Sequence, residues 1–101
     1  MRDPLRLVTV IPAYAGPPAN LRACLGRYDF GPGFFVRIRT RDGQLVVAAN
    51  WGDFTELVQT GEHSFVSRTL GATVTFSQSK DGEMALSWDG SPPVPRTERY
   101  E

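Results

Sequence analysis

The sequence predicts an all-β fold, an antiparallel meander that forms a sandwich or a barrel. Short segments alternate apolar and polar residues with the two-residue period of a half-buried strand. In residues 34–40, for example, Phe34, Val36 and Ile38 share one face. Turn signals recur about every 8–12 residues, which is typical of antiparallel sheets. Connections this short cannot hold the crossovers that a parallel sheet needs.

The same alternation continues to the end of the chain and predicts about seven or eight strands. Asp42-Gly43 and Asp81-Gly82 are the clearest hairpin turns, because glycine tolerates a positive φ. The residues expected to point inward are mostly large: Phe34, Val36, Ile38, Leu45, Val47, Phe54, Leu57, Phe65, Val74, Phe76, Met84 and Leu86. Side chains of this size would fill a small barrel and leave little room inside it.

One short helix is expected before the strands. We interpret residues 1–19 as an N-terminal tail or strand with a Pro-rich linker, and residues 20–101 as the domain. Asn20 can cap a helix that starts at Leu21, and Gly26 can end it in a left-handed turn. Such a short helix is not stable alone, so its apolar residues must pack on the sheet. It fits best across an open end of a barrel.

Composition excludes several classes of partner. The chain has 101 residues, enough for one domain with a core, and 41% of them are hydrophobic. Eleven basic and eleven acidic residues cancel, so we predict no nucleic-acid partner and no anionic membrane surface. No apolar run approaches the roughly 18 residues of a membrane span, and no export signal is visible.

The segment LRACLGRYDFGPGFFVRIRTRDGQLVVAAN, residues 21–50, resembles the start of the small C-terminal domain of β-lactamase-related serine hydrolases. In that family a short helix leads into Gly-x-Tyr and a first strand, and an acidic-Gly hairpin is followed by Leu. The resemblance extends over roughly residues 20–99. The matching positions are Leu21, Gly26, Tyr28, Val36, Asp42-Gly43, Leu45, Leu57, Phe65, Val74, Phe76, Asp81-Gly82, Leu86, Gly90 and a late arginine, Arg96 or Arg99.

This resemblance implies a single antiparallel meander β-barrel of lipocalin-like appearance, with the short helix covering one end. Similar domains lie outside the catalytic domain and carry no known catalytic residues. It therefore implies a non-catalytic accessory domain, whose partner is a hydrolase catalytic domain in the same or another chain. The alternative is lipocalin-like binding of a small apolar ligand in the barrel, with Trp51 and Trp88 at its mouth.

Outward residues of one strand are the candidates for the docking surface. Phe35, Arg37, Arg39 and Arg41 alternate with the inward-facing residues, so they share the outer face. Guanidinium groups in such a row can bind an anionic group or an acidic partner. A solvated face that pairs with acidic neighbours across the strands is the simpler interpretation.

Candidate catalytic residues are few, and we predict that the chain is not an enzyme. Residues 77–80, SQSK, match the Ser-x-x-Lys spacing of penicillin-recognising enzymes. They run from a strand into a turn, whereas that chemistry needs the serine at the start of a helix. His63 is the only histidine, so no multi-histidine metal site is expected. A Cys24–His63 dyad is conceivable, but a cysteine packed on the sheet would be inert. No cofactor is predicted.

Overall fold

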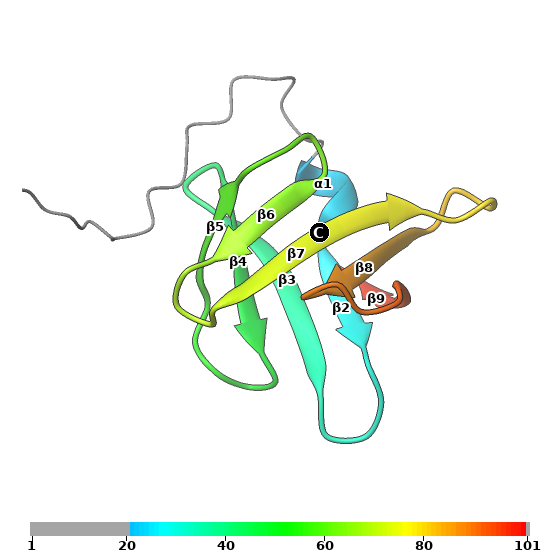
Figure 1. Cartoon of the computed structure of the whole chain (residues 1–101), viewed down its shortest axis with the longest axis horizontal. Helices are drawn as coiled ribbons and strands as arrows, with labels where there is room; N and C mark the ends of the chain where they lie inside the picture. Colours follow the sequence, from blue (N-terminus) through cyan, green and yellow to red (C-terminus); the bar gives the residue numbers. More distant parts are fainter. Residues whose placement is uncertain (1–20, 101) are drawn as a thin grey trace, which may run out of the picture.

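The structure, a computed structural model, describes residues 21–100. Eight antiparallel strands close into one barrel, and each strand pairs with its neighbours in the sequence (Figure 1). The elements are α1 (Leu21–Cys24), β2 (Gly26–Asp29), β3 (Phe35–Arg41), β4 (Gln44–Ala49), β5 (Thr55–Gln59), β6 (Ser64–Ser67), β7 (Ala72–Gln78), β8 (Met84–Trp88) and β9 (Val94–Arg99). The all-β prediction and the meander barrel with one short helix are confirmed.

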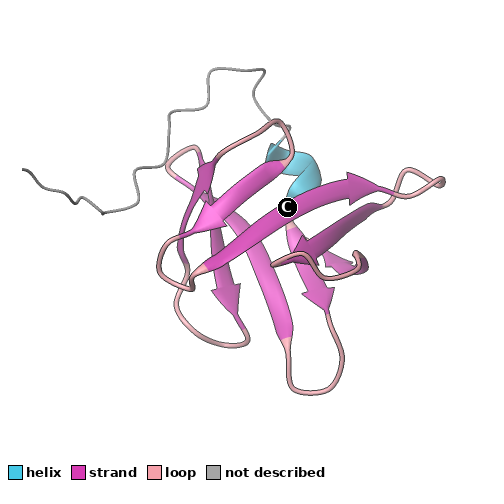
Figure 2. Cartoon of the chain, in the orientation of Figure 1, coloured by secondary structure: helices cyan, strands magenta, loops and turns pink. Residues whose placement is uncertain are grey.

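The barrel closes where β9 pairs with β2, and the helix lies across one end. β2 pairs with β3 on one side and with β9 on the other. In Figure 2 the only helix of the described residues lies at the end of the barrel opposite the β2–β3 loop. Within residues 21–100 no helix has the length and apolar character required to span a bilayer.

The hairpin between β3 and β4 forms at the turn that the sequence predicts. Arg41 pairs with Gln44, so Asp42 and Gly43 are the two turn residues. Their φ angles are 54° and 79°. Two consecutive positive φ values match the type I′ turn, whose twist suits a two-residue hairpin.

One hydrophobic core fills the barrel, and three aromatic rings pack against one another within it. Tyr28 is fully buried, and its ring centroid lies 6.1 Å from that of Phe76 in an edge-to-face arrangement. Phe65 meets Phe76 in the same way at 5.8 Å. The core consists of Cys24, Leu25, Tyr28, Val36, Ile38, Leu45, Val47, Leu57, Phe65, Val74, Phe76, Met84 and Leu86. The expectation of a barrel filled by large inward side chains is therefore met.

Two of the residues expected to point inward behave differently. Phe34 is half-buried at the edge of the core, 5.5 Å from the ring of Trp88. Phe54 does not belong to the core: its ring lies 4.7 Å from the guanidinium of Arg37, an outward residue of β3. The inward prediction for Phe54 is wrong because this residue precedes β5 in a loop, where strand alternation does not apply.

The expected role of Gly26 also needs correction. The helix ends at Cys24, and Gly26 is the first residue of β2, with φ of 154°. A Cβ at this position would overlap the carbonyl oxygen of Glu98 and the side chain of Arg96. Gly26 thus permits the close approach of β9 rather than ending the helix. The Asn20 cap and the interpretation of residues 1–19 lie outside the described residues.

Candidate functional site

A partly exposed stack of arginine and aromatic side chains covers the outer surface of β2 and β3 and the loop after β4. We name it the arginine–aromatic face; its members are Arg27, Phe35, Arg37, Trp51 and Phe54. The guanidinium of Arg27 lies 3.8 Å from the Phe35 ring centroid. Phe35 and Trp51 meet edge to face at 5.0 Å. Trp51 remains 74% exposed.

Arg37 fixes the loop that carries Trp51. Its Nε donates to the carbonyl of Asn50 at 2.8 Å, and its Nη2 donates to the carbonyl of Gly52 at 2.9 Å. The guanidinium lies 5.0 Å from the Trp51 ring and 4.7 Å from the Phe54 ring. Asn50 holds the loop from the other side, because its Oδ1 accepts the backbone N–H of Phe35 at 2.9 Å. The loop is therefore built around Arg37, and Trp51 is displayed outward.

The arginine stems of β3 also shield apolar residues on the outer surface of β4. Val46 and Ala48 alternate with core residues and face outward, yet they are 2% and 0% exposed. Arg39 is the register partner of Val46, and Arg37 is that of Ala48. The methylene stems of arginine can cover such neighbours while the charged ends stay in water. This packing explains why β4 carries buried residues on both faces.

The four residues predicted as a docking surface lie in three neighbouring environments. Phe35 and Arg37 lie within the arginine–aromatic face. The Arg39 guanidinium stacks on Tyr100 at 4.0 Å. Arg41 lines a separate hollow of about 350 Å³ together with Arg68, and Phe54 borders the same hollow. Phe54 thus links the face to the hollow, so the four predicted residues lie along one side of the barrel.

Asp29, at the edge of this side, has a lowered pKa. Asp29 is held mainly by Thr97, whose hydroxyl donates to its Oδ2 at 2.7 Å. The Nε of Arg27 contacts the other carboxylate oxygen at 3.1 Å. These hydrogen bonds lower the pKa of Asp29, the bond from Thr97 contributing most. The ionised Asp29 orients Arg27 over Phe35.

A second candidate site is a cleft beneath α1, at the end of the barrel that the helix covers. We name it the α1 cleft. Its volume is about 440 Å³, and it opens between the helix, the β5–β6 loop and the start of β8. The apolar lining residues are Ala23, Cys24, Phe65, Phe76 and Met84. The polar lining residues are Glu62, His63, Ser77 and Gln78.

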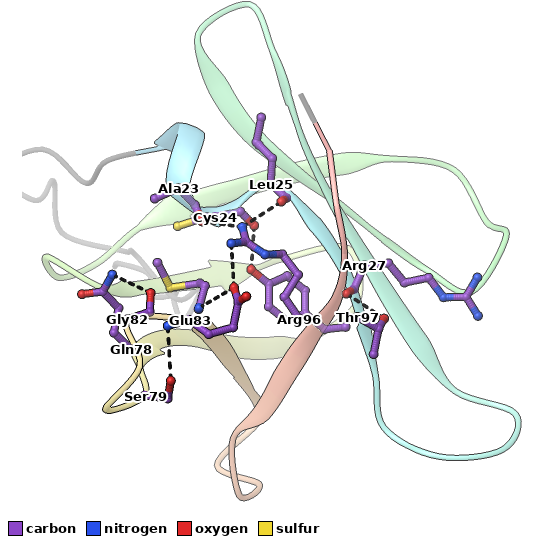
Figure 3. A network of polar contacts seen from close by, with 12 residues as sticks. Ala23, Cys24, Leu25, Arg27, Gln78, Ser79, Gly82, Glu83, Arg96 and Thr97 are labelled. Carbon is purple, nitrogen blue, oxygen red and sulfur yellow. Dashed lines mark hydrogen bonds and ion pairs between the residues drawn. The ribbon is translucent and has the colours of Figure 1, made fainter.

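Arg96 of β9 holds the helix that roofs this cleft (Figure 3). Its Nη1 donates to the carbonyl of Ala23 at 2.8 Å and to that of Leu25 at 3.1 Å. Its Nη2 contacts Glu83 Oε1 at 2.8 Å, and the Arg96 side chain is only 5% exposed. The hydrogen bond from Arg96 is the main reason that the pKa of Glu83 is lowered. A buried guanidinium thus satisfies carbonyls at the helix end that have no partner within the helix.

Tyr28 completes this support from inside the barrel. Its hydroxyl donates to the carbonyl of Cys24 at 2.8 Å. Burial raises the pKa of the Tyr28 hydroxyl well above its usual range, so the group stays protonated and remains a donor. The end of α1 is therefore tied to β2 and β9 by side chains that approach its last carbonyls.

Cys24 and His63 line the same cleft, but their environments do not suit nucleophilic chemistry. Burial raises the pKa of the Cys24 thiol to about 11, against the opposing effect of the Arg96 charge. The thiolate is the reactive form, so this thiol is almost fully protonated near neutral pH. His63 Nε2 lies 3.8 Å from Glu62 Oε2, in a pair whose side chains are 66% and 55% exposed.

The Ser-x-x-Lys motif of residues 77–80 forms part of a hairpin in the structure. Ser77 and Gln78 end β7, and Ser79 and Lys80 enter the turn before β8. Ser79 Oγ accepts the backbone N–H of Glu83 at 3.2 Å, which stabilises this turn. The helical spacing that places the lysine beside the serine is therefore not formed here. Among residues 21–100, no group of three or more His, Cys, Asp or Glu side chains is placed to hold a metal ion.

The two tryptophans proposed for the barrel mouth have different surroundings. Trp88 ends β8 and packs at the edge of the core against Phe34. Trp51 belongs to the exposed arginine–aromatic face. The α1 cleft is lined by other residues.

Comparisons of this chain with protein-family models, with curated proteins and with solved structures give no match.

Several residues of these two sites were not singled out from the sequence as site residues. Arg27 and Phe54 join the arginine–aromatic face only through the register of β2 with β3 and the path of the β4–β5 loop. Glu62, Gln78 and Met84 meet in the α1 cleft although they lie on different elements. For Arg27, the outward alternation of Arg27 with Tyr28 is a signal that the sequence does contain.

Proposed function

We propose that this chain is a non-catalytic accessory domain that packs on a hydrolase catalytic domain, in the same or another chain, through its arginine–aromatic face. The observation that carries the proposal is the exposure of Trp51, which is 74% accessible although it is stacked with Phe35 and Arg37. A large exposed aromatic side chain held in a fixed orientation is typical of a contact residue.

The composition of the face also supports an interface. Tryptophan and arginine are the residue types most enriched among those that dominate binding energy. The side chains are already ordered by stacking and by the hydrogen bonds of Arg37, so binding would immobilise few of them. The exposed Arg39 and Arg41 beside the face favour a partner surface that combines apolar groups with carboxylates.

The resemblance to the C-terminal domain of β-lactamase-related serine hydrolases supplies the class of partner. An exposed tryptophan does not stabilise an isolated domain, because removing its apolar surface from water is favourable. A partner domain that covers Trp51 would remove this apolar surface from solvent.

A titration tests the proposal directly. The chain is titrated by calorimetry into a separately produced catalytic domain of a β-lactamase-related serine hydrolase encoded in the same genome. We expect saturable binding, and we expect Trp51→Ala to weaken it about thirtyfold, because a central tryptophan contributes about 2 kcal/mol. The matched control is Leu70→Ala, which removes another exposed apolar side chain, 39% accessible, from the β6–β7 turn.

Both variants should keep the thermal unfolding midpoint of the parent chain, since both side chains are exposed. Binding that Trp51→Ala and Leu70→Ala weaken equally would contradict docking through the arginine–aromatic face. An absence of binding by the unmodified chain would contradict the accessory function itself.

A further inference from the structure

The α1 cleft takes no part in the docking proposed for the arginine–aromatic face. It lies under the helix and is lined by residues of β6, β7 and β8, whereas the arginine–aromatic face lies on β2, β3 and the loop after β4. Its volume of about 440 Å³ is within the range of small-molecule sites. Binding of a ligand in this cleft does not require a partner domain.

The inner part of the cleft is apolar and aromatic. Phe65, Phe76 and Met84 are 2%, 3% and 9% exposed, and the two phenylalanine rings are fixed edge to face at 5.8 Å. The small parts of these side chains that remain accessible border the cleft, and aromatic rings and thioethers both pack well on a further ring. A ligand with a flat, apolar body suits this part of the cleft.

The outer part of the cleft holds the Glu62 carboxylate beside the imidazole of His63, whose Nε2 lies 3.8 Å from Glu62 Oε2. Ser77 and Gln78 add polar groups to this part of the cleft, and within residues 21–100 no Lys or Arg lines it. The neighbouring cation, Arg96, is engaged by Glu83 and by the helix carbonyls. The charge of the lining therefore favours a cationic ligand head and opposes a carboxylate.

We propose that the α1 cleft binds a small arylalkylamine, with its ring against Phe65, Phe76 and Met84 and its ammonium group beside Glu62. The ammonium donates hydrogen bonds to the Glu62 carboxylate, and the Ser77 hydroxyl is a further acceptor at the same rim. The ring fills the apolar inner part, which α1 keeps shielded because Arg96 holds the end of the helix.

The three probes share a phenylethyl group and differ only in the polar group at its end. They are 2-phenylethylamine, 2-phenylethanol and 3-phenylpropionate, and binding is followed by the NMR signal of the ¹³C-labelled Met84 methyl group. The chain has two methionines, and Met84, the one among residues 21–100, lines the cleft, so its assigned signal reports on this site. We expect saturable shifts with the amine and a Kd of about 1 mM, as befits a ligand this small.

The charge preference should follow Glu62. We expect the amine to bind about tenfold more tightly than the carboxylate, and Glu62→Gln to reduce this ratio to about twofold. Glu56→Gln is the matched control, since Glu56 is an exposed glutamate that lines the other hollow. Ala23→Leu should abolish binding of all three probes, because the longer side chain occupies the cleft from the helix.

Two results would overturn the proposal. One is the absence of a saturable shift of Met84 with any probe. The other is a preference for the amine that survives Glu62→Gln unchanged, since the charge of Glu62 would then play no part. Glu62 is exposed, so its substitution keeps the fold and the test does not depend on the packing variant Ala23→Leu.

Discussion

The Cys24 thiol is 4% exposed at the inner side of α1, and its burial raises its pKa to about 11. A cysteine with the ordinary thiol pKa of 9.0 has a much larger thiolate fraction at mildly alkaline pH. We therefore predict that iodoacetamide alkylates Cys24 about a hundredfold more slowly in the folded chain than in urea, on the basis of thiolate fractions alone.

Mass spectrometry of quenched time points measures this ratio, and the chain serves as its own control because it has one cysteine. Equal rates in the folded and unfolded chain would contradict the protected, protonated state of the thiol. They would also return the Cys24–His63 pair to consideration as a reactive site, since both residues line the same cleft.

At the scale of single elements, the close approach of β9 to β2 depends on Gly26. A Cβ there would overlap backbone as well as side-chain atoms, and its φ of 154° is rarely adopted by other residues. We predict that Gly26→Ala lowers the free energy of unfolding by about 3 kcal/mol, measured by urea denaturation. Gly90→Ala, at a positive φ of 84° with open space around it, should cost only about 1 kcal/mol.

Equal losses in these two variants would mean that backbone conformation alone sets the cost. The difference between them measures the contact of Gly26 with Arg96 and Glu98. The same contact brings Arg96 to the end of α1, so the loss in Gly26→Ala should be accompanied by weaker attachment of the helix.

The strands could be predicted from the sequence because their periodicity is local. Alternation assigns Val36 and Ile38 to the core and Phe35 and Arg37 to the outer face, as observed. The side of Phe54 could not be predicted, since it depends on the path of a loop that Arg37 organises from another strand.

Long-range contacts set a second limit on what the sequence predicts. Arg96 reaches the carbonyl of Ala23 across 73 positions of the chain, and no local pattern marks that pair. The residues of the α1 cleft come together for the same reason, from the helix and from three strands and a loop. The arrangement of a site thus depends on barrel closure, whereas the alternation that fills the barrel does not.

The whole barrel consists of two halves joined along two short seams. β9, β2, β3 and β4 form one half, and β5 to β8 form the other. At one seam β4 and β5 pair only through Val46 with Glu56 and Val47 with Thr55. At the other, β8 and β9 pair only through Ala85 with Pro95 and Leu86 with Val94. Pro95 has no N–H to donate, so the β8–β9 seam has few backbone hydrogen bonds.

The ion pair between Glu83 and Arg96 spans this second seam, since Glu83 directly precedes β8 and Arg96 lies in β9. The hydrogen bond from Arg96 lowers the pKa of Glu83 below the ordinary value of a glutamate. A carboxylate with a lowered folded-state pKa stabilises the fold above its unfolded-state pKa, and this contribution is lost as the pH falls through the folded-state value.

We predict that Glu83→Ala speeds amide hydrogen exchange along β8 and β9 about tenfold at neutral pH and leaves β3 and β4 unchanged, because the β3–β4 register is continuous from Val36 to Arg41. Mass spectrometry of peptic fragments measures both regions in one experiment. Glu98→Ala, which removes an exposed carboxylate from β9 itself, should leave both regions at parent rates. Equal acceleration of all strands by Glu83→Ala would show that the barrel opens as one unit and that the seam has no separate stability.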